Sequence, residues 1–380
     1  MSAYYPIVTL TGPRQAGKTT LIRHVFPEKE YVSLEDPDMR YLAQSDPRIF
    51  LGRFPDGAIF DEVQRAPELF SYLQTIVDMS NKEGMFILSG SQSFLLQEKI
   101  SQSLAGRAAV LKLLPLSLAE LSDSKISVDD LEQVLFTGGY PRIFDKSIPT
   151  SDFFPSYLQT YLERDVRTLQ NVQNLDSFSL FIRLCAGRIG QLLNISSLAT
   201  ECGVSVNTAK GWLSILEASY IIFRLRPHYK NFNKRLVKMP KLYFYDTGLA
   251  CYLLGLQNTE QLLSHYMRGE VFENFVIAEL VKARINSGQE TNLYFWRDHK
   301  GLEVDCIVDK GGELAAIECK SGRTVTFSFF DNLNKWSTLA AGDSTGKVVV
   351  YAGDISQVVA GAELLSWRDL PQKVNGLVGL

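Results

Sequence analysis

The sequence predicts an α/β protein with several domains, and three observations support this fold class. A glycine-rich loop at residues 12–19 stands between an apolar run and a helical pattern. Short apolar runs then alternate with amphipathic stretches, which is typical of a parallel sheet with helices on both faces. The length of 380 residues exceeds one ordinary core and predicts two or three units. We expect domains at residues 1–120, 121–265 and 266–380.

The glycine-rich loop has the pattern G-x-x-x-x-G-K-T, which is typical of a site for a nucleoside triphosphate. Its glycines allow successive backbone N–H groups to surround the β-phosphate, while Lys18 supplies positive charge to the β- and γ-phosphate oxygens. Thr19 offers its hydroxyl to Mg²⁺ at the N-terminus of the next helix. The nucleotide-binding residues predicted from this segment are Gly12, Pro13, Arg14, Gln15, Ala16, Gly17, Lys18, Thr19 and Thr20.

A second apolar run, residues 58–60, ends in Asp61 and Glu62. Such a run fits a strand that is buried in a parallel sheet. Asp61 at its end is placed to hold Mg²⁺ through the water shell of the ion, and Glu62 is placed to polarise a water for attack on the γ-phosphate. The pair therefore predicts hydrolysis as well as binding. The alternative without a function is a solvated Asp-Glu pair at a strand end.

The other elements of the first domain follow the same alternation. Strands are expected at 31–37, where the proline stops the strand, and at 85–88, with a helix at about 67–79. The last strand opens into Ser89-Gly90-Ser91-Gln92. In the additional-strand class of P-loop proteins a small polar residue at this place contacts the γ-phosphate or its attacking water, so Ser89 and Ser91 are both candidates.

Composition limits the environment and the partners of the chain. Hydrophobic residues make up 46% and charged residues 21%, as in an ordinary globular protein. The net charge of −3 gives no chain-wide basic surface, so any nucleic-acid site must be local. No apolar run reaches the length of a membrane span, and a phosphate loop that starts at residue 12 leaves no room for a signal peptide, so we expect a cytoplasmic protein without a membrane partner. The five cysteines form no C-x-x-C pair, which argues against disulfide and zinc sites.

These motifs, together with several shorter ones, resemble bacterial ATPases of the AAA+ superfamily that carry a large C-terminal domain. The resemblance covers nearly the whole chain and depends on residues 12–20, 34–37, 60–62, 88–91, 104–107, 138–141 and 161–165. It implies that the nucleotide is ATP, that Mg²⁺ accompanies it and that the chain hydrolyses it. It is also compatible with a homo-oligomer. The group tends to have a longer N-terminal lead that helps to close over the base, so the adenine contacts stay unassigned.

The same resemblance points to an arginine. Arg107 matches a conserved arginine of the group, which would stabilise γ-phosphate charge in the transition state, within one subunit or between two. Arg142 and Arg164 are alternatives for this role. A surface salt bridge is the alternative without a function for each of the three.

The middle of the chain is expected to be helical. Residues 116–193 have a helical pattern that breaks at 138–141 and would form a lid and linker. Residues 195–216 have a helix-turn-helix pattern with the turn at 203–205. The core face of the second helix is expected to hold Val206, Ala209, Leu213 and Leu216. The opposite face, which would enter a major groove, is expected to hold Asn207, Lys210 and Ser214.

A basic stretch follows, because no acidic residue occurs between Glu217 and Asp246. Its lysines and arginines, from Arg224 to Lys241, alternate with aromatic residues such as Phe223 and Tyr243. The pattern predicts the wing of a winged helix that binds nucleic acid, most simply DNA, through phosphates and stacked bases. The alternative is a winged helix that docks onto a protein partner. The residues expected to contact nucleic acid are Asn207, Lys210, Lys234, Arg235 and Lys238.

The last part of the chain again predicts an α/β pattern, with a helix at 269–284 that carries Glu273 and strands at 293–296, 302–308 and 313–319. A two-residue loop at Gly311-Gly312 makes Lys310 oppose Glu313, so that Asp305 faces Glu318 and Glu303 faces Lys320. Period-two alternation places these four charged residues on one face and leaves a core face of Val304, Cys306, Val308, Ala315, Ile317 and Cys319.

This hairpin geometry suits a metal. Opposed Cβ atoms lie about 5 Å apart, so Asp305 and Glu318 can share one divalent cation, with Lys320 beside it to stabilise a hydroxide or a pentacovalent phosphate. The same residues resemble the D…E-x-K signature of restriction-endonuclease-like folds, with Glu273 on the preceding helix. The resemblance implies Mg²⁺-dependent cleavage of DNA. Alternatives are an inert binding module of that fold and an exposed face of solvated acid-base pairs.

Two hypotheses for the whole chain follow from these patterns. In the first, an ATP-hydrolysing AAA+ enzyme holds nucleic acid with its winged helix and cuts or grips it with its C-terminal domain. In the second, a nucleotide-dependent switch uses the winged helix and an inactive nuclease-like domain to dock proteins. The basic stretch favours the first hypothesis, and the acidic net charge leaves room for the second.

Overall fold

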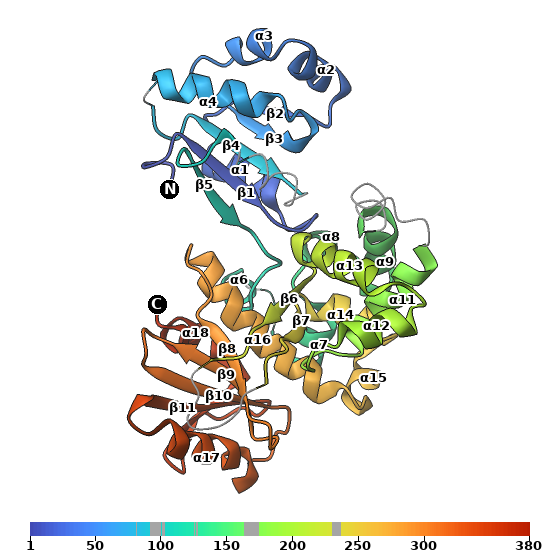
Figure 1. Cartoon of the computed structure of the whole chain (residues 1–380), viewed down its shortest axis with the longest axis vertical. Coiled ribbons are helices and arrows are strands. Elements are labelled where there is room, and N and C mark those ends of the chain that lie inside the picture. The colour runs from blue at the N-terminus through green and yellow to red at the C-terminus, as the bar shows by residue number, and fades with distance from the viewer. Residues whose placement is uncertain are drawn as a thin grey trace. The chain divides into compact units, whose positions relative to one another are not determined.

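The computed structural model describes residues 1–80, 82–91, 100, 103–124, 126, 128–162, 175–229 and 237–380 (Figure 1). These residues form two compact units. The first comprises Met1–Leu114 with Ala218–Tyr220, and the second comprises Pro115–Glu217 with Ile221–Leu380. Among the described residues no helix has both the length and the apolar character needed to cross a membrane.

A five-stranded parallel sheet with the order β2-β3-β4-β1-β5 forms the centre of the first unit. Its strands are β1 (Ile7–Thr11), β2 (Tyr31–Ser33), β3 (Ile59–Asp61), β4 (Phe86–Gly90) and β5 (Ala108–Lys112). The helices are α1 (Lys18–Val25), α2 (Pro37–Ser45), α3 (Pro47–Gly52) and α4 (Leu69–Ser80), with a 3-10 turn at Val63–Arg65. The parallel sheet predicted from the alternating pattern is confirmed.

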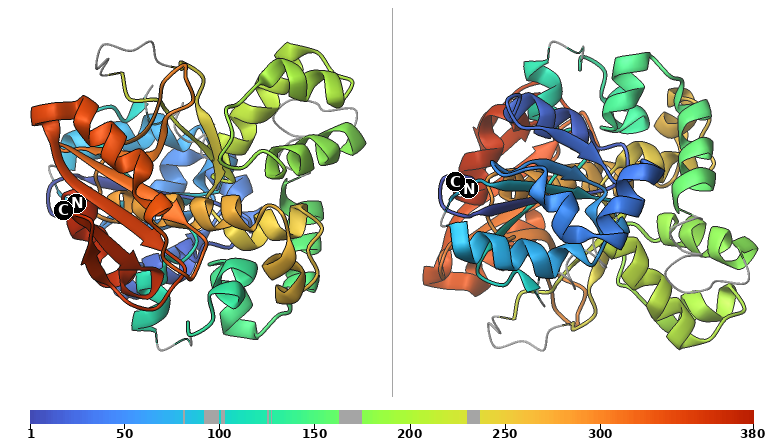
Figure 2. Two further views of the ribbon diagram at one scale, coloured as in Figure 1. Left: turned by 90° about the horizontal axis from the view of Figure 1, so that it is seen from below. Right: turned by 90° about the horizontal axis from the view of Figure 1, so that it is seen from above.

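Helices lie on both faces of this sheet (Figures 1 and 2), and apolar side chains pack between them and the strands. One cluster joins α1 to the central strands through Ile22, Val8 and Ile87. The larger cluster joins α3 and α4 to the other face through residues such as Phe50 and Phe70. Strands β1, β3 and β4 are buried along their whole length. Because they are parallel, their carboxyl ends meet at one edge, and the polar residues that follow them are brought together there.

The second unit begins with helices and ends with a sheet. Its helices up to the sheet are α6 (Leu118–Asp123), α7 (Leu131–Thr137), α8 (Pro141–Lys146), α9 (Thr150–Tyr157), α11 (Leu175–Ala186), α12 (Ile195–Glu201), α13 (Val206–Ala218), α14 (Thr247–Leu253), α15 (Thr259–Ser264) and α16 (Arg268–Asn286), with a π-helical turn at Leu158–Leu162. The longest of these, α16, is buried along most of its 19 residues, including the polar Asn274, Glu279 and Lys282. It is therefore an internal helix that needs polar partners.

The glycine pair at 138–139 provides one contact between distant parts of this unit. The Gly139 N–H donates to the buried Asp246 carboxylate at 2.7 Å, and a Cβ on Gly139 would lie 2.2 Å from the Leu116 carbonyl oxygen. A Cβ on Gly138 would lie 2.4 Å from the same carboxylate. Both positions therefore require glycine, and the break predicted at 138–141 has a packing role.

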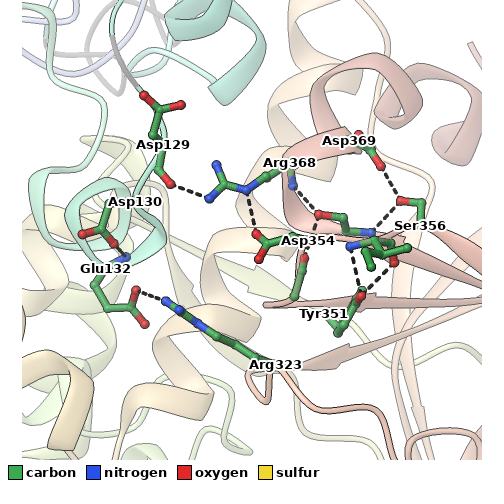
Figure 3. Close-up of polar contacts among 12 residues, drawn as sticks. Asp129, Asp130, Glu132, Arg323, Tyr351, Asp354, Ser356, Arg368 and Asp369 are labelled. Carbon is green, nitrogen blue, oxygen red and sulfur yellow. Dashed lines mark hydrogen bonds and ion pairs between the residues drawn. The ribbon is translucent and has the colours of Figure 1, made fainter.

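Arginines of the C-terminal segment hold the start of α7 (Figure 3). Arg323 and Arg268 both donate to the Glu132 carboxylate, at 3.0 and 2.6 Å. Arg368 donates to the Asp129 carbonyl oxygen and to the Asp354 carboxylate. The chain on either side of the helix-turn-helix is thus joined within one unit.

The helix-turn-helix of α12 and α13 is followed by an antiparallel pair, β6 (Ile222–Leu225) and β7 (Lys241–Phe244). Trp212, which the sequence pattern did not single out, is buried against the rings of Phe178 and Phe181. The expectation that Val206 lies on the core face is wrong, because its side chain is 39% exposed. As the first residue of α13, it lies before the point at which the helix meets α11.

The C-terminal sheet has six strands in the order β12-β13-β11-β10-β9-β8. They are β8 (Leu293–Arg297), β9 (Glu303–Asp309), β10 (Leu314–Lys320), β11 (Ser344–Tyr351), β12 (Gln357–Val359) and β13 (Ala362–Ser366). The neighbouring helices are α17 (Asp331–Ala340) and α18 (Leu370–Val378), with α17 on one face and α16 and α18 on the other. The sheet is mixed, because β10, β11 and β13 run parallel to one another.

The register predicted for the β9–β10 hairpin is confirmed. Lys310 N–H donates to the Glu313 carbonyl oxygen at 2.9 Å, and the pairing continues to Cys306 opposite Ile317. It ends there, one pair before Asp305 and Glu318. A regular ladder would direct the Cys319 N–H to the Val304 carbonyl, but the Asp305 carboxylate accepts it at 2.9 Å.

The prediction of one core face and one charged face for this hairpin is wrong. Cys306 and Ile317 pack in the cluster that includes α16, as expected. Ile307 and Ala316, however, pack on the opposite face against α17, and Val304 joins them instead of Cys306. Both faces of the sheet are therefore apolar cores, and the charged residues are confined to the open end of the hairpin.

Candidate functional site

The phosphate loop leaves β1 at Gly12 and enters α1 at Gly17. Gly12 has φ 150, and a Cβ there would lie 2.0 Å from the Leu113 carbonyl oxygen, so only glycine fits. Gly17 has φ 90, a conformation that favours glycine. Lys18 is almost fully buried, and its Nζ donates to the carbonyls of Gly12 and Pro13 at 2.9 and 2.8 Å. The loop thus holds the ammonium group within its own curve, where phosphate oxygens would meet it.

Asp61, at the end of β3, is oriented by donors from α1, β2 and β4 and by the backbone N–H of the next residue. Its Oδ2 accepts from the Thr19 hydroxyl at 2.7 Å and from the Tyr31 phenol at 2.7 Å. Its Oδ1 accepts from the Ser89 hydroxyl and from the Glu62 N–H. The structure therefore brings together the residues predicted for the metal, Thr19 and Asp61, with Ser89 of β4 beside them.

Tyr31 was not expected at this site. Burial and the Asp61 carboxylate raise the pKa of its phenol, so the group stays neutral and donates. An aromatic residue at the start of a strand is usually a core residue, so the sequence pattern does not place Tyr31 at the site. The sheet register does not indicate the contact either, because Tyr31 begins β2 opposite Ile59, whereas Asp61 ends β3 opposite Ser33.

Glu62 is fixed by two contacts of its own. Its Oε2 accepts from the Gln64 amide at 2.5 Å and from the Ser91 hydroxyl at 3.0 Å. Its backbone has φ 54, a left-handed conformation that costs a residue other than glycine about 1–3 kcal/mol. The two serine candidates thus have separate places, with Ser89 on Asp61 and Ser91 on Glu62. Gln64 lies in the short turn after β3 and was missed, since nothing in its spacing distinguishes it.

The exposed face predicted for α13 is exposed in the structure, at Asn207, Lys210 and Ser214. Lys238 is also exposed. Lys234 and Arg235 lie outside the described residues. The face is polar and carries little charge, so any phosphate contacts would depend on few side chains.

The basic stretch is less available for nucleic acid than the sequence indicated. Arg224 forms two hydrogen bonds with Glu217, at 2.5 and 2.6 Å, and Lys241 is 2% exposed. Phe223 and Tyr243 are buried and stacked on each other with ring centres 5.6 Å apart, so they do not stack on bases. The prediction that these aromatic residues stack on bases is therefore wrong, because the β6–β7 pair buries both side chains. The assignment of β6 and β7 to a wing stays a prediction.

The connection from β6 to β7 also runs along the C-terminal sheet. The Phe295 N–H donates to the Arg226 carbonyl at 3.0 Å, and the His228 N–H donates to the Phe295 carbonyl at 2.7 Å. On the other side of the connection, the Val237 N–H donates to the Arg297 carbonyl at 3.2 Å. These bonds cover the outer edge of β8. The described ends of the wing are thus part of the sheet.

The charged residues at the open end of the β9–β10 hairpin form a carboxylate cluster with α16. Glu318 is 1% exposed, and its Oε2 lies 2.5 Å from Lys320 Nζ. Burial and the nearby Asp305 raise the pKa of Glu318 to about 8. Burial and Asp305 likewise raise the pKa of Glu273 to about 7. The structure therefore does bring Asp305, Glu318, Lys320 and Glu273 together, in surroundings that disfavour further negative charge.

A lysine from outside the predicted site enters this cluster. Lys241 Nζ lies 3.0 Å from Glu273 Oε1 and also bonds Glu303. Tyr243 Oη, from the same strand, donates to Glu273 Oε1 at 2.6 Å. Burial alone would lower the pKa of Lys241, but the carboxylates of Glu273, Asp305 and Glu303 raise it, so the ammonium stays charged.

The ion pairs of this cluster leave less negative charge for a divalent cation. One oxygen each of Glu273 and Glu318 is bonded to a lysine, and one oxygen of Asp305 accepts a backbone N–H, whereas Oε1 of Glu318 is buried without a partner in the described part of the chain. Among the described residues, no group of three or more His, Cys, Asp or Glu side chains is placed to hold a metal ion. The metal pair predicted at Asp305 and Glu318 therefore stays a prediction, which the positive charge already supplied by Lys241 and Lys320 disfavours.

Comparison with known proteins matches three successive parts of the chain. Residues 4–122 match the model of an AAA domain, residues 128–260 a domain of unknown function (DUF8612), and residues 268–370 a domain of unknown function (DUF4143). Uncharacterized proteins of Mycobacterium tuberculosis and Mycobacterium bovis are each 31% identical over 328 residues, which is 85% of this chain and 72% of theirs. The chain belongs to the family of these mycobacterial proteins.

An uncharacterized protein of Haemophilus influenzae is more distant, at 20% identity over 91% of this chain and 89% of its own. Among solved structures, a Walker-type ATPase of Pyrococcus abyssi is 15% identical with a TM-score of 0.44, and it covers 66% of this chain and 91% of its own. The RuvB Holliday junction branch migration motor of Thermotoga maritima is 19% identical with a TM-score of 0.27, over 58% and 82% of the two chains. Both TM-scores are below the level that indicates a common fold.

The N-terminal part of this family member is an AAA-type ATPase domain, and its site fits the magnesium that accompanies a nucleotide. The Thr19 hydroxyl and the Asp61 carboxylate are oxygen donors 2.7 Å apart at a helix N-terminus. Mg²⁺ takes few protein ligands and fills its shell with water and phosphate oxygens, so two side chains suffice. The residues present therefore suit a metal that arrives with its nucleotide.

Arg107 has a partner within the domain. Its Nε and Nη2 donate to the two carboxylate oxygens of Asp78, on α4, at 2.5 and 2.9 Å. This is the surface salt bridge that the sequence left open as the alternative. Of the other two arginines, Arg142 is exposed on α8 of the second unit, and Arg164 lies outside the described residues. A role for any of them at the γ-phosphate stays a prediction.

Proposed function

We propose that the protein is a Mg²⁺-dependent ATPase whose chemistry takes place at the edge formed by β1, β3 and β4. The arrangement around Asp61 carries this proposal, because its carboxylate is held by Thr19, Tyr31, Ser89 and a backbone N–H while its charge is left uncompensated by these neutral donors. Such a group attracts a cation and has a fixed orientation toward it.

The side chains divide the reaction among them. Lys18 supplies positive charge to the β- and γ-phosphates from within the loop. Glu62 accepts from Gln64 and Ser91 at Oε2, and among the described residues no donor is bonded to its Oε1, which is thus available to accept a proton from the attacking water. When bound, Mg²⁺ would offset the charge that develops on the phosphates. The products are ADP and phosphate.

A pair of variants tests this proposal. Lys18→Ala should abolish both turnover and tight binding of ATP. Glu62→Gln keeps the shape and the contacts of the side chain but cannot take the proton, so binding should persist while turnover falls at least about 100-fold. Nucleotide affinity and single-turnover hydrolysis measured on both variants separate the two effects. Wild-type turnover in Glu62→Gln would assign the base to another residue.

We infer that nucleic acid, most simply DNA, is the partner of the middle domain, for which the exposed polar face of α13 is the supporting observation. The geometry also limits this function, because Lys241 and Arg224 are engaged by carboxylates. Lys210→Ala should lower the affinity for duplex DNA and flatten the dependence of log K on log salt by about one unit. Unchanged affinity and salt dependence would favour the alternative, in which this face docks a protein.

No cleavage step is assigned to the C-terminal domain. Two of its carboxylates are bonded to lysines, and the described residues hold no group of three or more His, Cys, Asp or Glu side chains placed for a metal. Within the proposal that this domain is restriction-endonuclease-like, it grips a partner without cutting it. In this proposal the first domain, residues 1–120, hydrolyses ATP. The middle domain, residues 121–265, binds nucleic acid, and the C-terminal domain, residues 266–380, supports that binding.

A further inference from the structure

The carboxylate cluster beside α16 is nearly neutral as a group. Its members come from β7, α16 and strands β8, β9 and β10, and two of them, Lys241 and Glu318, are almost fully buried. The carboxylates are Glu273, Glu303, Asp305 and Glu318, and the cations near them are Lys241, Arg297 and Lys320. Carboxylates gathered at this density repel one another unless a cation lies among them.

Lys241 is the cation at the centre of the group. It is 2% exposed, its Nζ contacts Glu273 on α16 and Glu303 on β9, and it lies 5.7 Å from the centre of the Phe295 ring. Lys320 and Arg297, in contrast, keep 27% and 37% of their side chains exposed. Water can solvate those two, whereas Lys241 depends on its carboxylates and they depend on it.

The backbone of β7 directs Lys241 to this place. Alternate residues of a strand point to the same side, and both Lys241 and Tyr243 reach Glu273 Oε1, at 3.0 and 2.6 Å. The strand is held on one side by β6 and at Leu192 by a bridge to Lys241. Strand β7 therefore holds the Lys241 ammonium group in a fixed position.

We propose that Lys241 is a built-in cation that replaces a divalent metal in this cluster, and that it fastens β7 of the middle domain to α16 and β9 of the C-terminal domain. An ammonium brings a single charge and no open coordination position. The cluster therefore maintains the structure of the second unit without metal and does not activate water. This inference is independent of the ATPase proposed for the first unit.

A variant that removes the charge of Lys241 but keeps an unbranched apolar side chain tests the proposal. Lys241→Met should lower the Tm by roughly 5–10 °C, because partners of a buried pair are left without their counter-charge. Mn²⁺ without nucleotide should then restore much of the loss, since the carboxylates regain a cation. Lys238→Met, which changes an exposed lysine three positions earlier, is the matched control and should have the Tm and the Mn²⁺ response of the protein without it. All variants are made in an Asp61→Ala background, so that manganese cannot bind beside Thr19.

The double variant Lys241→Met, Glu273→Gln removes one charge of each sign and should recover part of the Tm with a weaker response to Mn²⁺. If Lys241→Met does not fold, calorimetric titration of the Asp61→Ala protein with Mn²⁺ decides alone. The proposal requires no binding there. Binding of one Mn²⁺ that Asp305→Ala abolishes would overturn it, as would a Lys241→Met protein of unchanged Tm.

Discussion

Two carboxylate sites of the described residues differ in the partners of their carboxylates, one at the edge of the first sheet and one at the end of the β9–β10 hairpin. Asp61 accepts hydrogen bonds from hydroxyl groups and a backbone N–H, all of them uncharged. Glu273 and Glu318 accept from the ammonium groups of Lys241 and Lys320. Neutral donors orient a carboxylate and leave its charge for an arriving cation, whereas an ammonium cancels that charge. The partner of the carboxylate thus indicates which group is built for a metal.

The first prediction tests the comparison at Asp61 by removing one of its neutral donors. Tyr31→Phe removes one neutral donor worth about 1 kcal/mol, so the Mg²⁺ concentration for half-maximal ATP turnover should rise about 3- to 10-fold. ATP affinity without metal and turnover at saturating Mg²⁺ should change little, because the phenol orients Asp61 and touches no phosphate. The measurement is a magnesium titration of hydrolysis at fixed ATP.

Two further variants set the scale for this titration. Tyr41→Phe, which changes a tyrosine that is 73% exposed, should reproduce the wild-type curve. Asp61→Asn keeps the shape of the side chain and removes its charge, so it should impair magnesium use far more than Tyr31→Phe does. If Tyr31→Phe has the wild-type magnesium dependence, the phenol is a packing group and the donors of Asp61 are fewer than the structure indicates.

The site around Asp61 could be predicted well from the sequence, because its residues lie at the ends of regular strands and helices. The phosphate loop and the strand that ends at Asp61 are local patterns, and a parallel sheet leaves one edge at which they can meet. Ser89 and Ser91 stayed alternatives because the sequence does not show which carboxylate each hydroxyl reaches. That depends on the path of the chain at the end of β4. Tyr31 was missed since an aromatic residue in a strand is usually core.

The second group was predicted only in part, for a physical reason. A glycine loop sets the register of a hairpin, so the approach of Asp305 to Glu318 followed from local spacing. Ile307 and Ala316 alternate with the charged residues and could have indicated a second buried face. Lys241 could not be recognised, because it lies in a basic run and its burial depends on Glu273, 32 residues further along the chain. Charge burial is decided by long-range packing.

A smaller effect sharpens the comparison at Glu318. Burial and Asp305 raise its pKa to about 8, whereas a free glutamate has a pKa of 4.5. Between these values the folded protein holds a proton that the unfolded chain releases, so the free energy of unfolding falls as the pH rises through this window. Glu273, with a pKa raised to about 7, contributes in the same direction. The wild-type Tm should therefore decrease from about pH 5 to about pH 8.

The side chain in Glu318→Gln cannot titrate, so the decrease of Tm with pH should be much smaller in this variant. The part of the decrease that is due to Glu273 should remain. Thermal unfolding followed by circular dichroism at several pH values gives the slopes. Glu313→Gln, at an exposed position in the loop of the same hairpin, is the matched control and should keep the wild-type slope. An identical slope in Glu318→Gln would mean that the hairpin carboxylate is already ionised. The cluster would then have one more uncompensated charge, and a divalent cation would fit it as one fits Asp61.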